Sequence, residues 1–270
     1  MAYALLMLAA PLFTIFLLSF WTQDFLEIDR SFHLGNYREA LTDPIYRTLM
    51  LRSLRVAALV TLATVLLAFP LAYFVSFHVA AERKSIWLFL ITIPFWTSYL
   101  IRVFLWRVIL AFDGPVNGSL MALGVIEAPL GWMLYNVNAV VITLAHAYAP
   151  FAILPIFVAL ERIDRSLLEA ARDLGENQVM TFLRVTLPLA APGVLAAALI
   201  VFIPTIGDYV TPRLVGGSQG LMIANMIHAQ IFDLNNRPMG ATLAVLAMSI
   251  VGAVALAAIF LTRRWTGRKS

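Results

Sequence analysis

The sequence SLLEAARDLGENQVMTFLRVTLP, residues 166–188, lies between two long apolar segments and contains five charged side chains. The whole chain of 270 residues is 61% hydrophobic and only 13% charged. Soluble domains usually contain about 25% charged residues, so this composition is typical of a protein with several membrane-spanning helices. A compact polar segment between two such helices therefore indicates a loop with a function of its own at one membrane face.

The pattern within this loop predicts two short helices joined at a glycine. Ser166 followed three residues later by Glu169 is a capping box, in which each side chain bonds a free backbone N–H at the start of a helix. Gly175 fits the position just after the helix, where a left-handed backbone conformation ends it. A second helical piece is expected before the next apolar segment begins. We call residues 161–189 the elbow loop.

Six segments are apolar and long enough to cross a membrane as helices, which takes about 20 residues each. They lie near 2–21, 54–78, 86–110, 137–160, 190–208 and 240–262. The first lacks a basic N-terminal region and a clear cleavage site, so we expect an uncleaved helix rather than a signal peptide. Prolines inside the later spans remove backbone donors and are expected to bend their helices: Pro70, Pro94, Pro150, Pro155 and Pro204. The expected fold is an all-α membrane protein with six transmembrane helices.

The distribution of Lys and Arg predicts the orientation, because cytoplasmic loops are enriched in these residues. The loop 79–85, the elbow loop and the C-terminal tail together hold ten of them. The loops on the other side hold six, and four of those six lie in the segment 22–53, where five acids balance them. Both termini and the elbow loop are therefore predicted to lie in the cytoplasm.

Several classes of active site are excluded by the residues present. The chain has no cysteine, so thiolate metal sites and cysteine nucleophiles are excluded. Its four histidines are dispersed and form no HExxH pattern, and no GxxxxGK[ST] phosphate-binding loop occurs. No acids, bases and metal ligands converge in the sequence. The chain is therefore expected to be neither an enzyme nor an ATPase, and to hold no metal.

The elbow loop matches the pattern EAA-x3-G-x9-[IV]-x-LP. The matching residues are Glu169, Ala170, Ala171, Gly175, Val185, Leu187 and Pro188. The pattern resembles the EAA loop of permease subunits of binding-protein-dependent ABC importers, which have the MetI-like type I fold. In that family the loop is a coupling helix that sits in a groove of the cytoplasmic ATPase subunit. The resemblance implies an ATPase-coupling role for Glu169, Ala170, Ala171, Gly175, Leu187 and Pro188. The simpler alternative is that these residues only cap, pack and turn the chain.

The resemblance covers about residues 50–260 and implies how the chain is organised. Residues 1–49 would form the first transmembrane helix and an outer loop, residues 50–260 a permease core of five transmembrane helices, and residues 261–270 a basic cytoplasmic tail. The implied partners are a dimer of ATP-binding cassette subunits, a second homologous permease, and a periplasmic or lipid-anchored solute-binding protein. ATP and Mg²⁺ would bind the ATPase subunits, with no cofactor on this chain, in a bacterial plasma membrane.

Two further stretches indicate the solute. IPFWTSYLIR at residues 93–102, and GDYVTP at residues 207–212 with LVGG at residues 214–217, are similar to stretches in the permeases of spermidine/putrescine importers. The resemblance implies transport of a polyamine. Relatives carry other small organic solutes, including opines, amino-acid derivatives and phosphonates, which leaves a second possibility. A secondary transporter working without an ATPase is a third, and it gives the elbow loop no role.

A polyamine pathway would need carboxylates for ammonium groups and aromatic faces for cation–π contacts. Asp208 lies at the end of a span, after Pro204 and Gly207, which are expected to break that helix. An ionisable residue at membrane depth is a candidate for function. The predicted pathway residues are Asp208, Tyr209, Trp96, Tyr99 and Phe202. The alternatives are a capping role or a salt bridge to Arg213 for Asp208, and interface packing for the aromatic residues.

Overall fold

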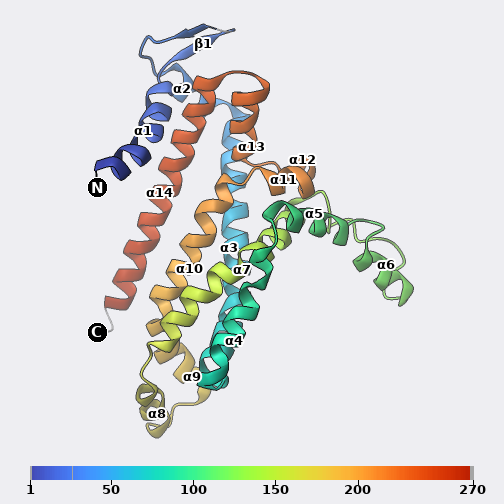
Figure 1. The fold of residues 1–270 in the computed structure, drawn as a ribbon, viewed down its shortest axis with the longest axis vertical. Coiled ribbons are helices and arrows are strands. Elements are labelled where there is room, and N and C mark those ends of the chain that lie inside the picture. Colours follow the sequence, from blue (N-terminus) through green and yellow to red (C-terminus); the bar gives the residue numbers. More distant parts are fainter. Residues whose placement is uncertain (1, 26, 268–270) are drawn as a thin grey trace. The chain divides into compact units, whose positions relative to one another are not determined.

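The computed structural model describes residues 2–25 and 27–267, which fold mostly as helices (Figure 1). The elements in chain order are α1 (Ala2–Leu18), β1 (Thr22–Asp24), β2 (Glu27–Asp29), α2 (Gly35–Thr42), α3 (Pro44–His78), α4 (Ala81–Thr92), the 3-10 turn η1 (Ile93–Trp96), α5 (Tyr99–Ile109), α6 (Pro115–Ala122), α7 (Val137–Glu161), α8 (Arg165–Asp173), α9 (Gln178–Thr181), the π-helix η2 (Phe182–Thr186), α10 (Leu187–Gly207), α11 (Val210–Val215), α12 (Gly217–Gly220), α13 (Ile223–His228), the π-helix η3 (Ala229–Asp233) and α14 (Arg237–Gly267).

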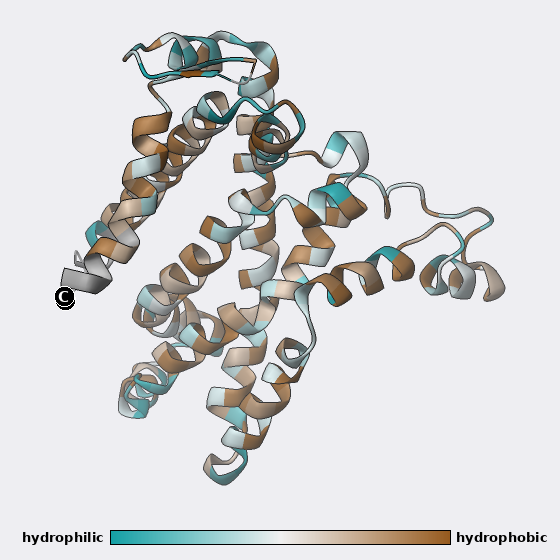
Figure 2. Ribbon diagram, turned by 45° about the horizontal axis from the view of Figure 1, so that its top comes forward, coloured by the Kyte–Doolittle hydropathy of each residue, from teal (hydrophilic) through white to brown (hydrophobic). Residues whose placement is uncertain are grey.

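Four stretches of helix are long and apolar enough to cross a membrane: Pro44–His78, Val137–Glu161, Gln178–Gly207 and Arg237–Arg264. Figure 2 shows hydrophobic residues along most of their length. A bent pair of helices would make a fifth span. The helix that begins at Ala2 has 17 residues, fewer than the roughly 20 that a span needs. The all-α character agrees with the prediction, but in the described residues the count of six spans is not reproduced.

The predicted third span, 86–110, is not one helix. Ala81–Trp96 and Tyr99–Ile109 meet at an angle of 85°. The 3-10 turn that precedes the break contains Pro94, which supplies no backbone donor. The other prolines expected to bend helices lie inside helices that continue past them: Pro70, Pro150, Pro155 and Pro204.

The contacts divide the chain into two compact units. One comprises the chain up to Val56, Leu110–Val140 and Ile206–Ala253. The other comprises Ala57–Ile109, Val141–Thr205 and the chain from Val254 onward. The elbow loop falls entirely within the second unit, so its geometry is described there.

The first unit is held by polar bonds between its buried segments. Ser53 on α3 accepts a hydrogen bond at 2.7 Å from the backbone N–H of Ile223, which begins α13. Thr242 on α14 donates to the backbone oxygen of Ser19 at 2.9 Å. A two-stranded antiparallel hairpin, in which Thr22 pairs with Asp29, was not predicted. Its alternation is too short to stand out in the sequence.

The glycine-rich stretch 216–220, which reads as a flexible turn in the sequence, is packed helical structure. A Cβ on Gly217, whose φ is +57°, would lie 2.6 Å from the backbone oxygen of Tyr135. A Cβ on Gly216 would lie 2.6 Å from the backbone oxygen of Pro212. These glycines allow close backbone approach within the first unit rather than flexibility.

In the second unit, α7 and α10 pack through small residues. A Cβ on Gly193 of α10 would lie 2.3 Å from the Cβ of Ala159 and 2.6 Å from the backbone oxygen of Pro155, both on α7. Small residues let membrane helices approach closely where the hydrophobic effect gives no preference for protein over lipid. Fully buried apolar residues fill the rest of this core: Val60, Ala72, Val103, Leu144, Ile156, Ala190, Ala197 and Val201.

Candidate functional site

The first helix of the elbow loop begins at a different cap from the predicted one. Asp164 is the N-cap of α8, and its Oδ1 accepts a hydrogen bond at 3.0 Å from the backbone N–H of Ser166. The capping box between Ser166 and Glu169 is therefore wrong, because α8 already begins at Arg165. The backbone N–H of Ser166, with a smaller effect from its hydroxyl, holds the pKa of Asp164 below its usual value. The ionised cap therefore stabilises α8 fully above the ordinary carboxyl pKa, and this stabilisation is lost as the pH falls through the lowered value.

The end of α8 is the glycine turn that the sequence predicts. Gly175 has a φ of +85°, in the left-handed region. Its N–H donates to the backbone oxygen of Arg172 at 2.9 Å, and the N–H of Glu176 donates to that of Ala171 at 3.1 Å. These two bonds make a Schellman motif, which satisfies carbonyls that the helix end would leave free. The predicted role of Gly175 in ending the helix is confirmed.

The exposed face of α8 carries part of the predicted coupling set. Glu169 and Ala170 are exposed, as is Gly175. Leu174, which the sequence did not single out, is 86% exposed. Ala171 is buried and packs within the chain. The exposed surface of α8 therefore has a small side chain, Ala170, beside the carboxylate of Glu169 and the apolar side chain of Leu174.

The second half of the elbow loop is continuous with the following span. Asn177 caps α9 by accepting a hydrogen bond from the N–H of Met180 at 2.9 Å. The helix then runs through the π-helix η2 into α10, so Leu187 and Pro188 lie within a helix and do not separate two of them. The N–H of Leu187 donates to the backbone oxygen of Phe182, five residues back, in the wider π turn. This half of the loop is thus part of the same continuous helix as α10.

A polar cluster beside the elbow loop was missed by the sequence reasoning. Oε1 of Glu161, at the end of α7, accepts hydrogen bonds from Ser76 Oγ at 2.6 Å and Lys84 Nζ at 2.7 Å. Arg165, the first residue of α8, approaches the same oxygen at 3.4 Å. The four-residue spacing of Glu161 and Arg165 was no signal for this pair, because the rule for such spacings holds within one helix and these residues end α7 and begin α8. We call Ser76, Lys84, Glu161 and Arg165 the polar clamp.

A cavity of about 260 Å³ lies next to the clamp in the same unit. Its lining residues come from α3, α8 and the start of the following helix: Tyr73, Phe77, His78, Leu168, Arg172, Gln178, Thr181, Phe182 and Thr186. The Oγ1 of Thr181 is buried there without a hydrogen-bond partner among the described residues. The packing of α8 against α3 is therefore open on this side.

The predicted pathway residues are divided between the two units. In the first, Asp208 is 8% exposed and its Oδ1 accepts from the N–H groups of Val210 at 2.9 Å and Thr211 at 3.2 Å. This is the capping geometry that the sequence left open for Asp208. Pro204 does not break the helix as expected, but α10 does end at Gly207, the other residue expected to break it.

The aromatic members of the predicted pathway differ in their surroundings. Tyr209 stacks on His228 in the first unit, with ring centroids 5.0 Å apart. In the second unit, Trp96 is 72% exposed and meets Phe89 edge to face. Tyr99 and Phe202 in that unit are half-buried. These placements leave the pathway role of the five residues a prediction.

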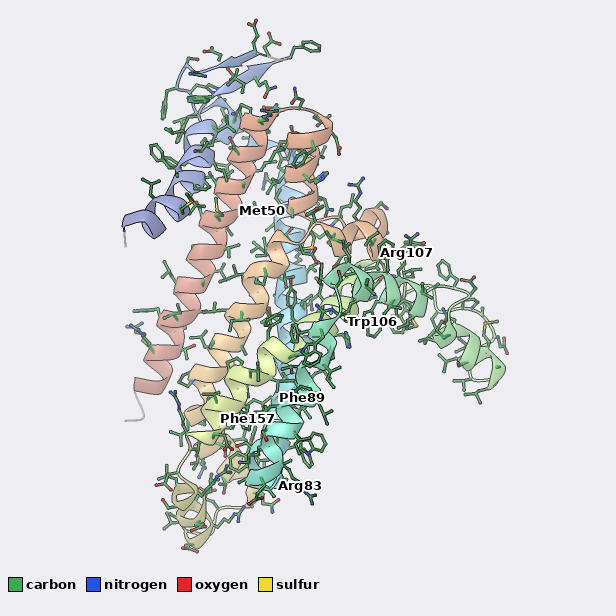
Figure 3. All side chains as sticks on the ribbon, viewed as in Figure 1. Met50, Arg83, Phe89, Trp106, Arg107 and Phe157 are labelled. Carbon is green, nitrogen blue, oxygen red and sulfur yellow. The ribbon has the colours of Figure 1, made fainter. Side chains whose placement is uncertain are left out.

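Arg102 of the third predicted span and His146 of the fourth also lie in the second unit. Arg102 places its guanidinium 5.3 Å from the ring centre of Phe95. Trp106 on α5, labelled in Figure 3, donates from Nε1 to Nδ1 of His146 at 3.1 Å. His146 is thus hydrogen-bonded but exposed, so the packed environment that its sequence context favours is not found. Across the described residues, no group of His, Asp or Glu side chains is arranged to hold a metal ion.

Similar proteins connect this geometry to transport. The family model for binding-protein-dependent transport system inner membrane components matches residues 34–266. The Escherichia coli spermidine/putrescine transport system permease protein PotB is 36% identical over 225 residues, covering 83% of this chain and 81% of the relative.

Solved structures share the fold. A bacterial alginate ABC transporter, in complex with an alginate pentasaccharide-bound periplasmic protein, aligns with a TM-score of 0.71 at 15% identity, covering 98% of this chain and 91% of that one. The inward-facing MetNI methionine ABC transporter aligns with a TM-score of 0.61 at 18% identity, covering 83% and 98%. The family match spans most of the chain and includes α8 with its glycine turn. The chain therefore belongs to the family of binding-protein-dependent transport system inner membrane components, the permease subunits of ABC importers.

Proposed function

We propose that this chain is the permease subunit of an ABC importer that carries polyamines such as spermidine and putrescine into the cytoplasm. The observation that carries the solute is the 36% identity with a spermidine/putrescine permease over 83% of the chain. Energy comes from ATP hydrolysis in a separate subunit, consistent with the lack of a phosphate-binding loop in this sequence. A second permease and a solute-binding protein complete the importer.

The elbow loop is the proposed site of coupling to the ATPase. The exposed surface of Glu169 and Ala170, held in position by the Schellman turn at Gly175, supports this role. A small residue on an exposed helix face lets a partner backbone approach closely. Leu187 and Pro188 transmit rather than contact, because they lie in the helix that continues into α10.

The proposed cycle needs no chemistry in this chain. Closure of the ATPase dimer on ATP moves α8, and α8 moves the membrane helices so that the pathway opens outward. Solute from the binding protein enters and is released inward after hydrolysis. The ten Lys and Arg residues of the loop 79–85, the elbow loop and the tail, against six in the loops on the other side, support a cytoplasmic location for both termini and for α8.

Polyamine uptake by the reconstituted importer tests the solute. Proteoliposomes that contain this chain, its second permease and the ATPase, with the binding protein outside, should accumulate radiolabelled spermidine only when ATP is inside. Flux by this chain alone, driven by an ion gradient, would show a secondary transporter instead. ATP-dependent uptake of an amino-acid derivative or a phosphonate, with none of spermidine, would keep the importer and reject the polyamine.

A single introduced cysteine tests the docking of α8. The sequence has no cysteine, so Ala170→Cys places one reactive thiol on the exposed face of α8. We expect a thiol-reactive photo-cross-linker attached at this cysteine, which needs no thiol on the partner, to capture the ATPase subunit in native membranes. Ser31→Cys, on the exposed segment after β2, is the control and should give no ATPase cross-link. If the thiol of the Ala170→Cys variant reacts with an impermeant reagent from outside the cell, the orientation and the docking role are both overturned.

A further inference from the structure

We propose that the polar clamp is the mechanical joint that passes the movement of α8 to three membrane helices. This inference rests on the proposed coupling role of α8. Ser76 is near the end of α3, Lys84 is on α4, Glu161 ends α7 and Arg165 begins α8. The four side chains thus join the first turn of α8 to α3, α4 and α7 at one point in the second unit.

The joint is built around a single oxygen atom. Oε1 of Glu161 receives Ser76 Oγ at 2.6 Å, Lys84 Nζ at 2.7 Å and Arg165 Nη2 at 3.4 Å. Three donors that converge on one acceptor hold their parent helices at fixed separations. Hydrogen bonds to a charged acceptor are short and roughly twice as strong as neutral ones, so the joint resists relative movement.

Arg165 makes the connection to α3 independently of the carboxylate. Its guanidinium donates to the backbone oxygen of Ser76 at 3.1 Å and to Ser76 Oγ at 3.3 Å. The same group lies 3.8 Å from the ring centre of Phe77. A planar guanidinium that bonds at its edge and stacks on its face has little freedom to rotate. Movement of the first turn of α8 must therefore move the end of α3.

Apolar packing alone does not supply this connection. The cavity of about 260 Å³ separates part of α3 from Leu168 and Arg172 on α8. An open space on one side of a helix lets that helix shift before it pushes its neighbour. The polar clamp provides a direct connection where the cavity interrupts the packing, because its hydrogen bonds join α8 to α3 beside the cavity.

Partial burial makes the clamp sensitive to loss of its one acid. Ser76 is 2% exposed and the side chain of Lys84 18%, whereas those of Glu161 and Arg165 are 33% and 41% exposed. Without the carboxylate charge, the ammonium and guanidinium groups would lie close together with no anion between them. Partly buried charges that lose their partner are destabilised more than exposed ones, so the helices should move apart locally.

The test uses the complete importer in proteoliposomes and measures solute uptake per ATP hydrolysed. Glu161→Gln should lower this ratio about tenfold, as expected for loss of a coupled charged contact. Glu161→Asp, which keeps the charge, should recover most of it. Lys84→Met should lower the ratio as well, and adding it to Glu161→Gln should cost little more, because both changes break the same contact. Glu82→Gln, an exposed acid on the same turn of α4, is the matched control and should have no effect.

A distance measurement separates a joint from a merely structural role. Spin labels on Asp173→Cys and Ala80→Cys, both exposed, report the separation of α8 from the start of α4. With the clamp unaltered, the distribution of distances between the labels should be narrow and unchanged by ATP. Glu161→Gln should broaden that distribution.

The outcomes distinguish the two proposals. If Ala170→Cys with an intact clamp fails to cross-link to the ATPase, the coupling role of α8 is wrong. If it does cross-link but Glu161→Gln keeps the normal uptake per ATP, the clamp proposal is wrong and the coupling role stands. Equal losses of uptake and hydrolysis, or loss of the cross-link in Glu161→Gln, would show a structural role only and would also overturn the clamp.

Discussion

Gly175→Val should reduce solute uptake about tenfold or more while ATP hydrolysis by the importer continues. A Cβ at this position would meet no atom within 4 Å, so the effect does not come from a clash. It comes from the backbone, because φ is +85° and a β-branched residue strongly disfavours that region. Valine would straighten the turn, break the two Schellman bonds and change the angle at which α8 meets its partner.

The measurement is radiolabelled solute uptake beside phosphate release in the same proteoliposomes. Gly175→Asn is the matched control, because asparagine adopts the left-handed conformation more readily than other non-glycine residues. It should retain most of the uptake. If the valine variant transported solute as well as the asparagine variant does, the glycine turn would have no role in coupling. Two residues that differ in their tolerance of a positive φ would then behave alike.

Gly193→Ala should destabilise the folded membrane domain more than any other glycine-to-alanine change in its long helices. The added methyl would lie 2.3 Å from the Cβ of Ala159 and 2.6 Å from the backbone oxygen of Pro155. The second contact is with backbone, which cannot rotate away, so α10 must move from α7. Overpacking of this kind costs about 1–3 kcal/mol, and more when backbone must shift.

Thermal unfolding of the detergent-purified protein, followed by the loss of monodisperse material, measures this cost. Gly252→Ala on α14 is the control, because a Cβ there would have no neighbour within 4 Å. That change should leave the melting temperature the same or slightly higher, since alanine favours a helix over glycine. If both variants melted at the temperature of the unaltered protein, the close approach of α7 and α10 would be incorrect.

The features that the sequence predicts correctly are local ones. Gly175 follows a run of helix-forming residues, and the need for a left-handed residue after such a run is set by the backbone of that segment alone. The EAA spacing is likewise contained within twenty residues, so the family can be identified from it without any tertiary contact. Even a local pattern can mislead where two residues compete, as when Asp164 took the cap position expected for Ser166.

Features that depend on contacts between distant segments were not predictable. Glu161 bonds Lys84 and Ser76 across 77 and 85 residues, and nothing in their local sequence marks them as partners. The burial of Ala171 beside an exposed Ala170 likewise depends on which face of α8 meets the rest of the second unit.

The sequence by itself determined the helical membrane fold, the family and the glycine turn, because hydropathy, proline and glycine act through the few residues around them. Pro94 likewise marked the bend in the third span. The tertiary structure decided the face that α8 presents and the polar clamp. These depend on which side chains meet after the helices pack, and the energy of a contact belongs to the pair rather than to either sequence position.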